Sequence, residues 1–429
     1  MSQSASNAGD QPVPIDILRE RLIAFMHEQI FPRHADVHRE IMRSPAGHRP
    51  AVFAELRARA RAQGLWNLGM PLLPDDAPGT RLSNLQFAPM AEIMGWVYWA
   101  AEIFNCHAPD LPNMEMLAQL ADEDQRRQWL DPLLEGRISS GFAMTEPDVA
   151  SSDARNISCS IERDGDSWVL NGRKWFVGNC GRQDWRFVIA MGVTDPEAPP
   201  TRRHSAVIVP VNAPGVEVVR KVPVLGTRHH FSTHGELRFV DARVPAGNLL
   251  GERGRGFAAA QVRLATARIH HCMRFLGAAE VVLRLMIERA SQRHPFGIAL
   301  IERETIQHWI AHSRLELDQA RLMVLDAARQ LDELGGIGAR RSISMIKLAV
   351  AQACFALGDR AIQTFGAAGV TEDTPIGSFF AEARAFRIYD GPDEVHLRTI
   401  ARMELDETGS RWPAPLLPML HVPAGMEGS

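Results

Sequence analysis

The sequence lacks the signals that mark several classes of protein. Its five cysteines are scattered, with no Cys-x-x-Cys pair, so neither a disulfide framework nor a zinc site is indicated. No apolar run reaches the ~18 residues that a membrane-spanning helix needs. The first fourteen residues contain no Lys or Arg, unlike a secretory signal or a transit peptide. We therefore expect a cytoplasmic protein without metal or membrane, in which residues 1–14 are a disordered lead.

Charge and glycine patterns exclude two further classes. The formal net charge is −4, the pI is near 6.5 and no run of basic residues occurs, so we expect no nucleic-acid partner. No Gly-x-Gly-x-x-Gly motif follows a strand and opens a helix, as it does in the usual dinucleotide-binding fold. Gly251, Gly254 and Gly256 have a different spacing, which fits a hinge better than a phosphate loop.

The period of the hydrophobic pattern divides the 429 residues into three domains. Residues 15–140 repeat apolar side chains every three to four positions, which predicts a helical N-terminal domain. Residues 141–250 have a period near two, which predicts an antiparallel, barrel-like middle domain with a hairpin turn at Asn171-Gly172. Its strand candidates are residues 167–170, 186–190, 206–211 and 236–240.

The C-terminal domain, residues 251–410, is predicted to be a four-helix bundle, followed by a tail at residues 411–429. Its helices are expected near residues 257–291, 302–334, 340–367 and 376–405. The third is apolar on most faces, so it must be covered on several sides, which favours a bundle packed within an oligomer. The order helices, strands, helices predicts a mainly α protein with a central β domain.

Four short segments could carry chemistry. Residues 142–151 (FAMTEPDVAS) form a turn of small and hydroxyl side chains that could bind a ligand or simply cap a strand. Residues 171–178 (NGRKWFVG) join the turn signal to two aromatic side chains. Residues 293–297 (RHPFG) end the first long helix, where an Arg could also be an ordinary helix cap. Residues 387–395 (RIYDGPDEV) are, by themselves, typical of a polar loop between helices.

In this order and spacing the four segments resemble the acyl-CoA dehydrogenases, from about residue 15 to about residue 405. The resemblance implies the fold of that family, FAD as cofactor and an acyl-CoA thioester as substrate. It implies a trans-2-enoyl-CoA product and transfer of the electrons to an electron-transfer flavoprotein. It also implies a homodimer or homotetramer, because in the family residues 363–369 reach the flavin of a neighbouring subunit. The run from Asp390 to His396 is similar to the dehydrogenase portion of kinase-fused relatives, so medium-to-long or 4-hydroxylated acyl chains are candidate substrates.

The resemblance also assigns individual residues. Those expected to bind FAD are Phe142, Met144, Thr145, Ser151, Phe176, Val177, Gly178, Arg293, Phe296, Gln363, Gly366, Pro392 and Glu394. Those expected to contact the acyl-CoA are Ser151, Arg268, Tyr389, Gly391 and Arg402. Arg293 is expected to bind the FAD pyrophosphate through two parallel hydrogen bonds, a bidentate geometry that Lys cannot adopt. Gly178 departs from the family, where a Thr or Ser commonly donates to flavin N5.

Asp390 is the expected catalytic base. Most relatives carry Glu at this position, and others place the base on the first bundle helix, where this chain has Ala267 and no carboxylate in residues 264–271. A carboxylate with an ordinary pKa of ~4 is a weak base toward a carbon acid. We therefore expect a dry cleft to raise the pKa of Asp390. Asp is one methylene shorter than Glu, so the backbone or the substrate must lie closer.

Two alternatives stay open. The first is an oxygen-using flavoenzyme of the same fold, an oxidase or a monooxygenase. The carboxylate of Asp390 disfavours the monooxygenase, which does not need that base, whereas oxygen reactivity cannot be inferred from these motifs. The second is a catalytically silent relative that binds acyl-CoA, and Gly178 is its one supporting feature.

Overall fold

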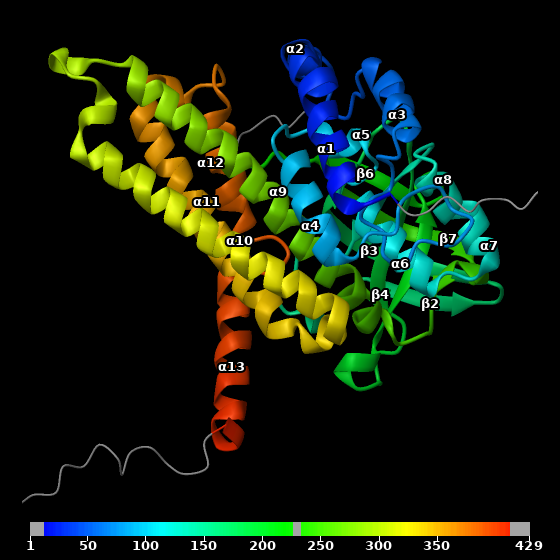
Figure 1. Cartoon of the computed structure of the whole chain (residues 1–429). Helices are drawn as coiled ribbons and strands as arrows, with labels where there is room; N and C mark the ends of the chain where they lie inside the picture. The colour runs from blue at the N-terminus through cyan, green and yellow to red at the C-terminus, as the bar shows by residue number, and fades with distance from the viewer. Residues whose placement is uncertain (1–12, 226–232, 412–429) are drawn as a thin grey trace, which may run out of the picture.

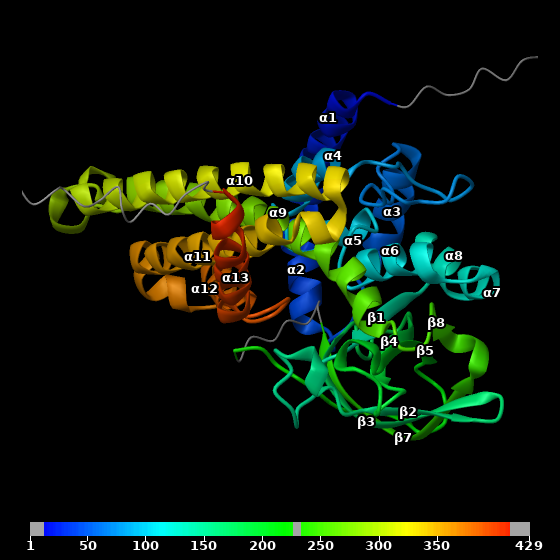
Figure 2. The ribbon, with the colours of Figure 1, turned by 90° about the horizontal axis from the view of Figure 1, so that it is seen from below.

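The computed structural model of the protein describes residues 13–225 and 233–411. A central sheet, a group of short N-terminal helices and an elongated bundle of C-terminal helices make up this part of the chain (Figure 1). Figure 2 shows the bundle extending to one side, away from the sheet. The predicted architecture, mainly α with a central β domain, is confirmed. The expected lead and tail, residues 1–14 and 411–429, lie almost wholly outside the described residues.

Short helices form the N-terminal domain, as the helical period predicts. They are α1 (Ile15–Phe25), α2 (His34–Arg43), α3 (Val52–Ala62), α4 (Asn84–Met94), α5 (Ala100–Ile103), α6 (Asp110–Leu120), α7 (Glu123–Gln125) and α8 (Asp131–Leu134). α4 begins with a capping box, in which Ser83 and Gln86 each accept a hydrogen bond from the other's backbone N–H. Phe25, Phe53 and Phe87 point into one core that these helices share with the C-terminal bundle. Burial of these apolar faces holds helices that would be too short to persist alone.

Eight strands form one sheet between the two helical regions. They are β1 (Ser139–Ala143), β2 (Ser160–Asp164), β3 (Ser167–Gly178), β4 (Trp185–Val193), β5 (His204–Pro210), β6 (Val216–Lys221), β7 (His234–Pro245) and β8 (Leu249–Leu250). The order across the sheet is β6-β7-β3-β2-β4-β5-β8, and β1 pairs with β4. Most neighbours are antiparallel, as expected, but β1 runs parallel to β4, which the long connection between them allows.

The expected hairpin turn at Asn171-Gly172 is wrong. β3 runs through both residues, and its register against β7 shifts between Leu170 and Gly172, which makes a bulge. The chain reverses instead at Gly165, in the turn that joins β2 to β3. Gly172 has φ 148°, and a Cβ there would lie 2.8 Å from the Cβ of Cys159. The glycine therefore serves close packing within a strand rather than a turn.

The C-terminal domain contains three long helices and a broken fourth. The long ones are α9 (Gly256–Gln292), α10 (Glu304–Gly338) and α11 (Arg340–Phe365), and the broken one comprises α12 (Pro375–Phe386) and α13 (Asp393–Arg411). The expectation of one helix over residues 376–405 is therefore wrong. Asp390 (φ 57°) and Gly391 (φ 102°) leave the helical region, and Pro392 has no N–H to continue it. α13 projects from the bundle (Figure 1).

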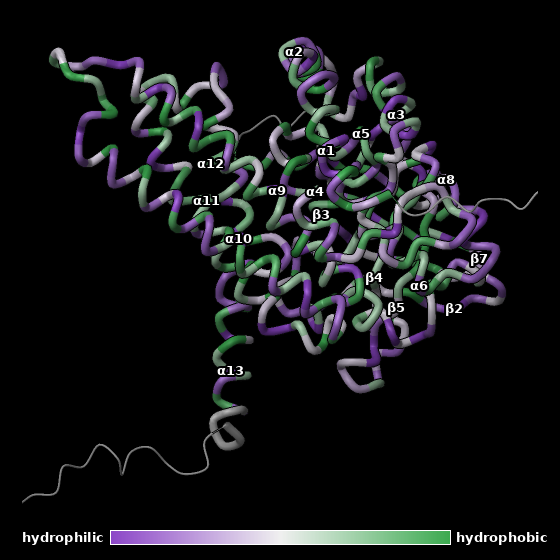
Figure 3. Tube along the Cα trace, in the orientation of Figure 1, coloured by the Kyte–Doolittle hydropathy of each residue, from purple (hydrophilic) through white to green (hydrophobic). Residues whose placement is uncertain are grey.

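One stretch of the described chain, Arg340–Val370, is long and apolar enough to cross a membrane by length and composition. In this fold 61% of its most apolar window is buried inside the protein, as expected for the core helix of a bundle. Figure 3 shows hydrophobic residues gathered where helices pack on one another and on the sheet, with hydrophilic residues on the outer loops. No group of His, Cys, Asp and Glu able to hold a metal ion occurs in residues 13–225 and 233–411.

α4 crosses α9 at backbone contact. A Cβ added to Gly277 on α9 would overlap the carbonyl oxygen of Glu92, and one added to Gly95 would overlap that of Arg274. Both positions must therefore be glycine for the two backbones to approach this closely. The crossing fixes the position of α9 against the N-terminal domain.

A buried carboxylate joins the N-terminal helices to the sheet. Glu102 accepts hydrogen bonds from Arg57 and Arg182, both at 2.6 Å, and from Arg49 at 2.7 Å. Burial alone would raise the pKa of Glu102, but these guanidinium groups and His107 hold it well below its ordinary range. Arg182 lies between β3 and β4, whereas the other two arginines precede α5. The cluster therefore connects two domains through a compensated buried charge.

The α4–α9 crossing can be tested with Gly277→Ala. The added methyl group meets backbone that cannot move aside, so we expect a loss of about 1–3 kcal/mol in the free energy of unfolding, measured by denaturant titration. Gly247→Ala is the matched control, because nothing lies within 4 Å of its added Cβ. Equal stability of the two variants would show that the helices do not need this close approach.

Candidate active site

Asp390 lies in the loop between α12 and α13, in a left-handed backbone conformation (φ 57°). The loop is closed by the backbone N–H of Asp393, which donates to the carbonyl of Arg387 at 3.1 Å. The Arg387 side chain also donates to the Asp393 carboxylate at 2.7 Å. Non-glycine residues rarely adopt this conformation, and such strain is concentrated at functional sites. The loop thus presents Asp390 in a fixed and unusual orientation.

Three side chains contact Asp390. Arg268 Nε donates to its carbonyl oxygen at 2.9 Å, and His396 Nε2 lies 3.2 Å from the same oxygen. His271 Nδ1 lies 2.5 Å from Asp390 Oδ2. Within the described residues no hydrogen bond involves the backbone N–H of Asp390. The predicted substrate-side residues Arg268 and Asp390 are thus brought together, with a donor left free beside them.

The sequence analysis missed His271. The prediction of the base depended on the absence of a carboxylate from residues 264–271 and left out the imidazole side chains of that stretch. The available signal was helical spacing, because His271 is three residues after Arg268 and therefore shares its face of α9. Tyr389 packs edge-on against the His271 ring, at 5.9 Å between centroids.

Burial and charge act in opposition on this pair. Burial alone would raise the pKa of Asp390, but His271, Arg268 and Arg263 outweigh it and hold that pKa below its ordinary range. Burial lowers the pKa of His271 more than Asp390 raises it. Arg268 and Arg263 thus favour the ionised carboxylate of Asp390, and burial favours the neutral imidazole of His271. The expected rise in the pKa of Asp390 is wrong for the protein by itself, because the neighbouring cations offset burial.

A second buried polar cluster lies between α6 and α9. Arg263 Nε donates to Asn113 Oδ1 at 2.7 Å, and its guanidinium lies 4.1 Å from the Phe142 ring centroid. Thr266 donates to one oxygen of Glu115, whereas the other buried oxygen lacks a hydrogen-bond partner among the described residues. Burial raises the pKa of Glu115 to about 8 and lowers that of Arg263 to about 10. Sequence reasoning gave no signal for this cluster, because its members come from helices far apart in the chain.

The segments expected to border the flavin ring lie side by side. Thr145 Oγ1 donates to the carbonyl of Trp175 at 2.9 Å, and Trp175 N donates back to Thr145 O at 3.1 Å. Phe176 has φ 54° and is 43% exposed, so the fold holds an aromatic ring outward at some cost in backbone strain. Val177 is fully buried in the sheet core, so it can offer a ligand only its backbone.

The remaining residues of these segments are placed as follows. Met144 belongs to the same segment as Thr145, and its carbonyl accepts from Lys174 Nζ at 3.0 Å. Ser151 folds back on Glu146, accepting from its N–H at 2.9 Å. Gly178 lies against Pro109, whose ring would be 3.3 Å from an added Cβ. The strained and exposed ring of Phe176 fits contact with the flat ring of a flavin.

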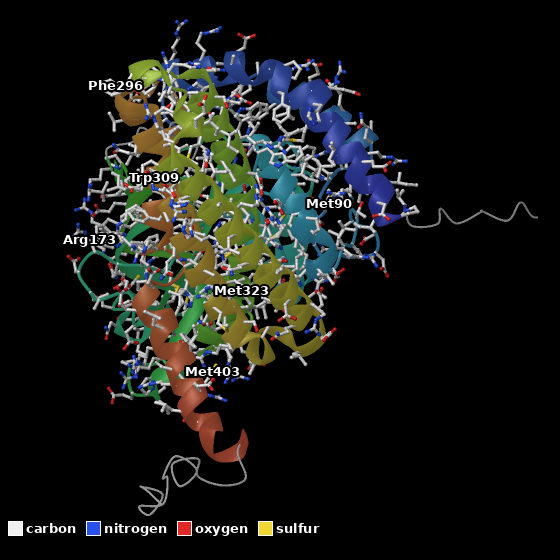
Figure 4. All side chains as sticks on the ribbon, turned by 60° about the vertical axis from the view of Figure 1, so that its left-hand side comes forward. Met90, Arg173, Phe296, Trp309, Met323 and Met403 are labelled. Atoms are coloured by element: carbon white, nitrogen blue, oxygen red, sulfur yellow. The ribbon has the colours of Figure 1, made fainter. Side chains whose placement is uncertain are left out.

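The predicted pyrophosphate residues lie at the other end of the bundle. Arg268 lies about a third of the way along α9 and Arg293 directly follows its last residue, so the two are ~37 Å apart at 1.5 Å per residue. Phe296 is 98% exposed at that far tip (Figure 4). The end of α11, which leads into Gln363 and Gly366, lies there too, since Arg289 of α9 donates to the carbonyl of Phe365 at 3.3 Å. One chain therefore carries two separated halves of the expected FAD site.

The last predicted residues surround the Asp390 loop or follow it. Pro392 and Gly391 belong to the loop, and a Cβ at Gly391 would lie 2.7 Å from His396 Nε2. Glu394 is exposed in the first turn of α13. Arg402 is exposed further along α13, near Met403 (Figure 4). Arg402 therefore does not meet Asp390 within one chain.

These features define a flavin-dependent oxidoreductase, and comparison with known proteins identifies its family. The family profile for the acyl-CoA dehydrogenase middle domain matches residues 141–242, and that for the C-terminal domain matches residues 254–405. The chain belongs to the acyl-CoA dehydrogenase family, whose members are oxidoreductases that act on CH–CH donors.

Individual relatives agree with this placement. The acyl-CoA dehydrogenase homologue FadE2 of Mycobacterium tuberculosis is 47% identical over 400 residues, which cover 92% of this chain and 96% of that protein. Mouse acyl-CoA dehydrogenase family member 10 is 45% identical over 403 residues, 94% of this chain, but the chain spans 38% of that longer relative. A solved acyl-CoA dehydrogenase homologue from Mycobacterium abscessus superposes with a TM-score of 0.88 at 40% identity, covering 92% of this chain and 99% of that one.

The Glu115 cluster predicts a pH-dependent stability. A carboxyl with a folded-state pKa of about 8, against 4.5 ordinarily, stays protonated in the fold while the unfolded chain ionises, so stability falls as pH rises between these values. Glu115→Gln should remove this loss and raise the melting temperature more at about pH 9 than at about pH 5. Thermal melts at both pH values give the measurement. An equal change at both would mean that Glu115 is ionised in the fold.

Proposed function

We propose that the protein removes hydrogen from Cα and Cβ of an acyl-CoA thioester with FAD, giving the trans-2-enoyl-CoA. The electrons then pass to an electron-transfer flavoprotein. The observation that carries this proposal is Asp390, a partly buried carboxylate on a loop with positive φ, whose backbone N–H makes no hydrogen bond within the described residues. Bound FAD would supply the acceptor for the hydride from Cβ. Family membership and the exposed Phe176 support the flavin.

The chain's own residues carry out the removal of the proton from Cα. Asp390 takes the Cα proton. Its N–H donates to the thioester carbonyl oxygen, which stabilises the negative charge that develops there and acidifies the Cα–H bond. Arg268 holds the Asp390 carbonyl, so the peptide group that carries this donor cannot turn away. Closing of the cleft around the acyl chain excludes water and strengthens both interactions.

A medium-to-long acyl chain, including a 4-hydroxylated one, is the proposed substrate. α9 continues beyond His271 to Arg274, which makes no hydrogen bond or ion pair with the described residues and lies in the electrostatic field of Tyr389 and Asp390. A polar substituent on the acyl chain could therefore find a donor there. The proposed location is the cytoplasm.

Assembly into a homodimer or homotetramer is also proposed, because it would join the two halves of the FAD site. Asp390 is held by Arg268 and His271 of α9, whereas Arg293 follows the last residue of that helix and Gly366 follows the last residue of α11. Apolar side chains are exposed along the surfaces that a second copy could cover: Leu315 (54%), Leu322 (68%), Val370 (71%) and Leu405 (74%). A neighbour placed with its bundle tip against Phe176 would complete each site.

The proposed activity predicts that purified protein is yellow and is bleached anaerobically by a suitable acyl-CoA. Asp390→Asn should retain flavin and acyl-CoA binding but lose bleaching by about 10²-fold or more, because the amide cannot accept the Cα proton. The measurement is stopped-flow absorbance across acyl-CoAs of varied length and substitution. Protein that stays colourless after reconstitution with FAD would contradict every flavin function, and unchanged bleaching in the variant would remove Asp390 as the base.

The shared site predicts complementation between two inactive variants. Arg293→Ala should lose FAD, whereas Asp390→Asn should bind FAD without turnover. In mixed oligomers isolated by two different tags, intact Asp390 of one copy meets intact Arg293 of the other, which restores up to about half of the sites of a dimer. Mixtures of the two separately purified, unexchanged proteins are the control. Inactive mixed oligomers would mean that one chain supplies the whole site.

A further inference from the structure

His271 and Asp390 form a hydrogen-bonded pair at the reacting end of the cleft. His271 Nδ1 lies 2.5 Å from Asp390 Oδ2, and the two side chains are 17% and 14% exposed. At this distance a proton must lie between nitrogen and oxygen, since two lone pairs would repel. The other carboxylate oxygen, Oδ1, makes no hydrogen bond to the described part of the chain.

We propose that His271, as the neutral Nδ1–H tautomer, is the positioning residue of the base: it holds Asp390 Oδ2, leaves Oδ1 for the Cα proton, and disables the base when protonated. This rests on the proposed role of Asp390 in dehydrogenation. The Cα–H bond breaks, its proton goes to Oδ1 and its electron pair forms the Cα–Cβ double bond; a bound flavin would accept the hydride that leaves Cβ. His271 keeps its own proton throughout.

Geometry explains why this chain needs a positioning residue. An Asp side chain is too short to reach distant hydrogen-bond partners. The left-handed backbone of Asp390 fixes the direction of its Cβ but not the rotation of its carboxylate. The ring of His271 is itself held from two sides, by Tyr389 and by Phe386, whose ring centroid lies 6.4 Å away. A rigid donor on a rigid helix therefore sets the carboxylate rotamer.

Burial favours the neutral form of His271, and the charges around it act in both directions. The titratable and charged groups that face the pair are Arg263, Arg268, His270, Arg274 and Cys272 on α9, Tyr389 on the loop, Lys347 on α11 and His396 on α13. Arg263, Arg268, Arg274 and Lys347 are cationic, so their repulsion opposes a second proton on His271, as burial does, whereas the Asp390 carboxylate favours it. Once added, that proton would convert the hydrogen bond into an ion pair and make Asp390 a weaker base.

His270 is the matched control, because it adjoins His271 but does not reach Asp390. It is 3% exposed, its ring meets Phe87 at 4.8 Å, and its two nitrogens have no hydrogen-bond partner among the described residues. Substituting it with Asn changes a buried histidine of the same helix without touching the pair.

The experiment measures the rate of anaerobic flavin bleaching against pH in the flavin-loaded protein. The wild type should lose rate toward acid, with a midpoint set by His271. His271→Asn places an amide donor near the Nδ1 position and does not titrate, so it should retain most of the rate at neutral pH. Its acid limb should move by at least about one pH unit toward acid, since the ordinary pKa of a carboxyl lies well below that of an imidazole. His271→Leu removes the donor and should lose roughly 10–100-fold at every pH.

Each outcome decides the proposal. A wild-type rate in His271→Leu, or an unshifted acid limb in His271→Asn, would overturn it, and so would an equal shift in His270→Asn. If neither His271 variant retains flavin, the wild-type profile decides: a decline on the acid side of neutrality supports the role of His271, and its absence refutes it. Failure of the wild type to bleach with any acyl-CoA would instead refute the proposed dehydrogenation.

Discussion

Where α4 crosses α9, Gly95 and Gly277 let two backbones touch, and the position of α9 against the N-terminal domain depends on that contact. α9 in turn supplies Arg268 and His271, which hold the loop of Asp390. A contact without any side chain thus determines where the base lies. Methyl groups at these two positions would separate the helices and shift every residue that α9 carries.

Burial affects the ionisable groups of the cleft in different directions, depending on what lies beside them. Glu115 has one hydroxyl donor and a distant cation, so burial dominates and its pKa rises to about 8. Asp390 is partly buried and faces an imidazole and two arginines, so its carboxylate is favoured instead. Burial thus favours the neutral carboxyl of Glu115 between α6 and α9, whereas the groups around the loop favour the ionised carboxylate of Asp390.

The sequence predicted the order and type of the domains because hydrophobic period reports burial on a helix or strand face, and burial dominates folding. The predictions were wrong where a local sequence pattern is compatible with two structures. Asn171-Gly172 favours a turn, but tertiary packing against Cys159 made it a bulge within β3. The single helix expected over residues 376–405 is broken at Pro392, where Asp390 and Gly391 take positive φ and the proline lacks an N–H. The motifs placed Arg268 and Asp390 together, whereas His271, Arg263 and Glu115 became visible only once the helices were packed.

α9 separates Asp390 from Arg293 by most of its length, and under the proposed assembly this distance links cofactor affinity to subunit contact. Release of the flavin and dissociation of the subunits become parts of one equilibrium, so each strengthens or weakens the other. Dilution should then release FAD and reduce the yellow colour of the protein, and added FAD should favour reassembly of the subunits. A subunit with an inactivating substitution would also inactivate a site to which an intact subunit contributes. The loss of activity in a mixed oligomer would therefore affect intact chains as well.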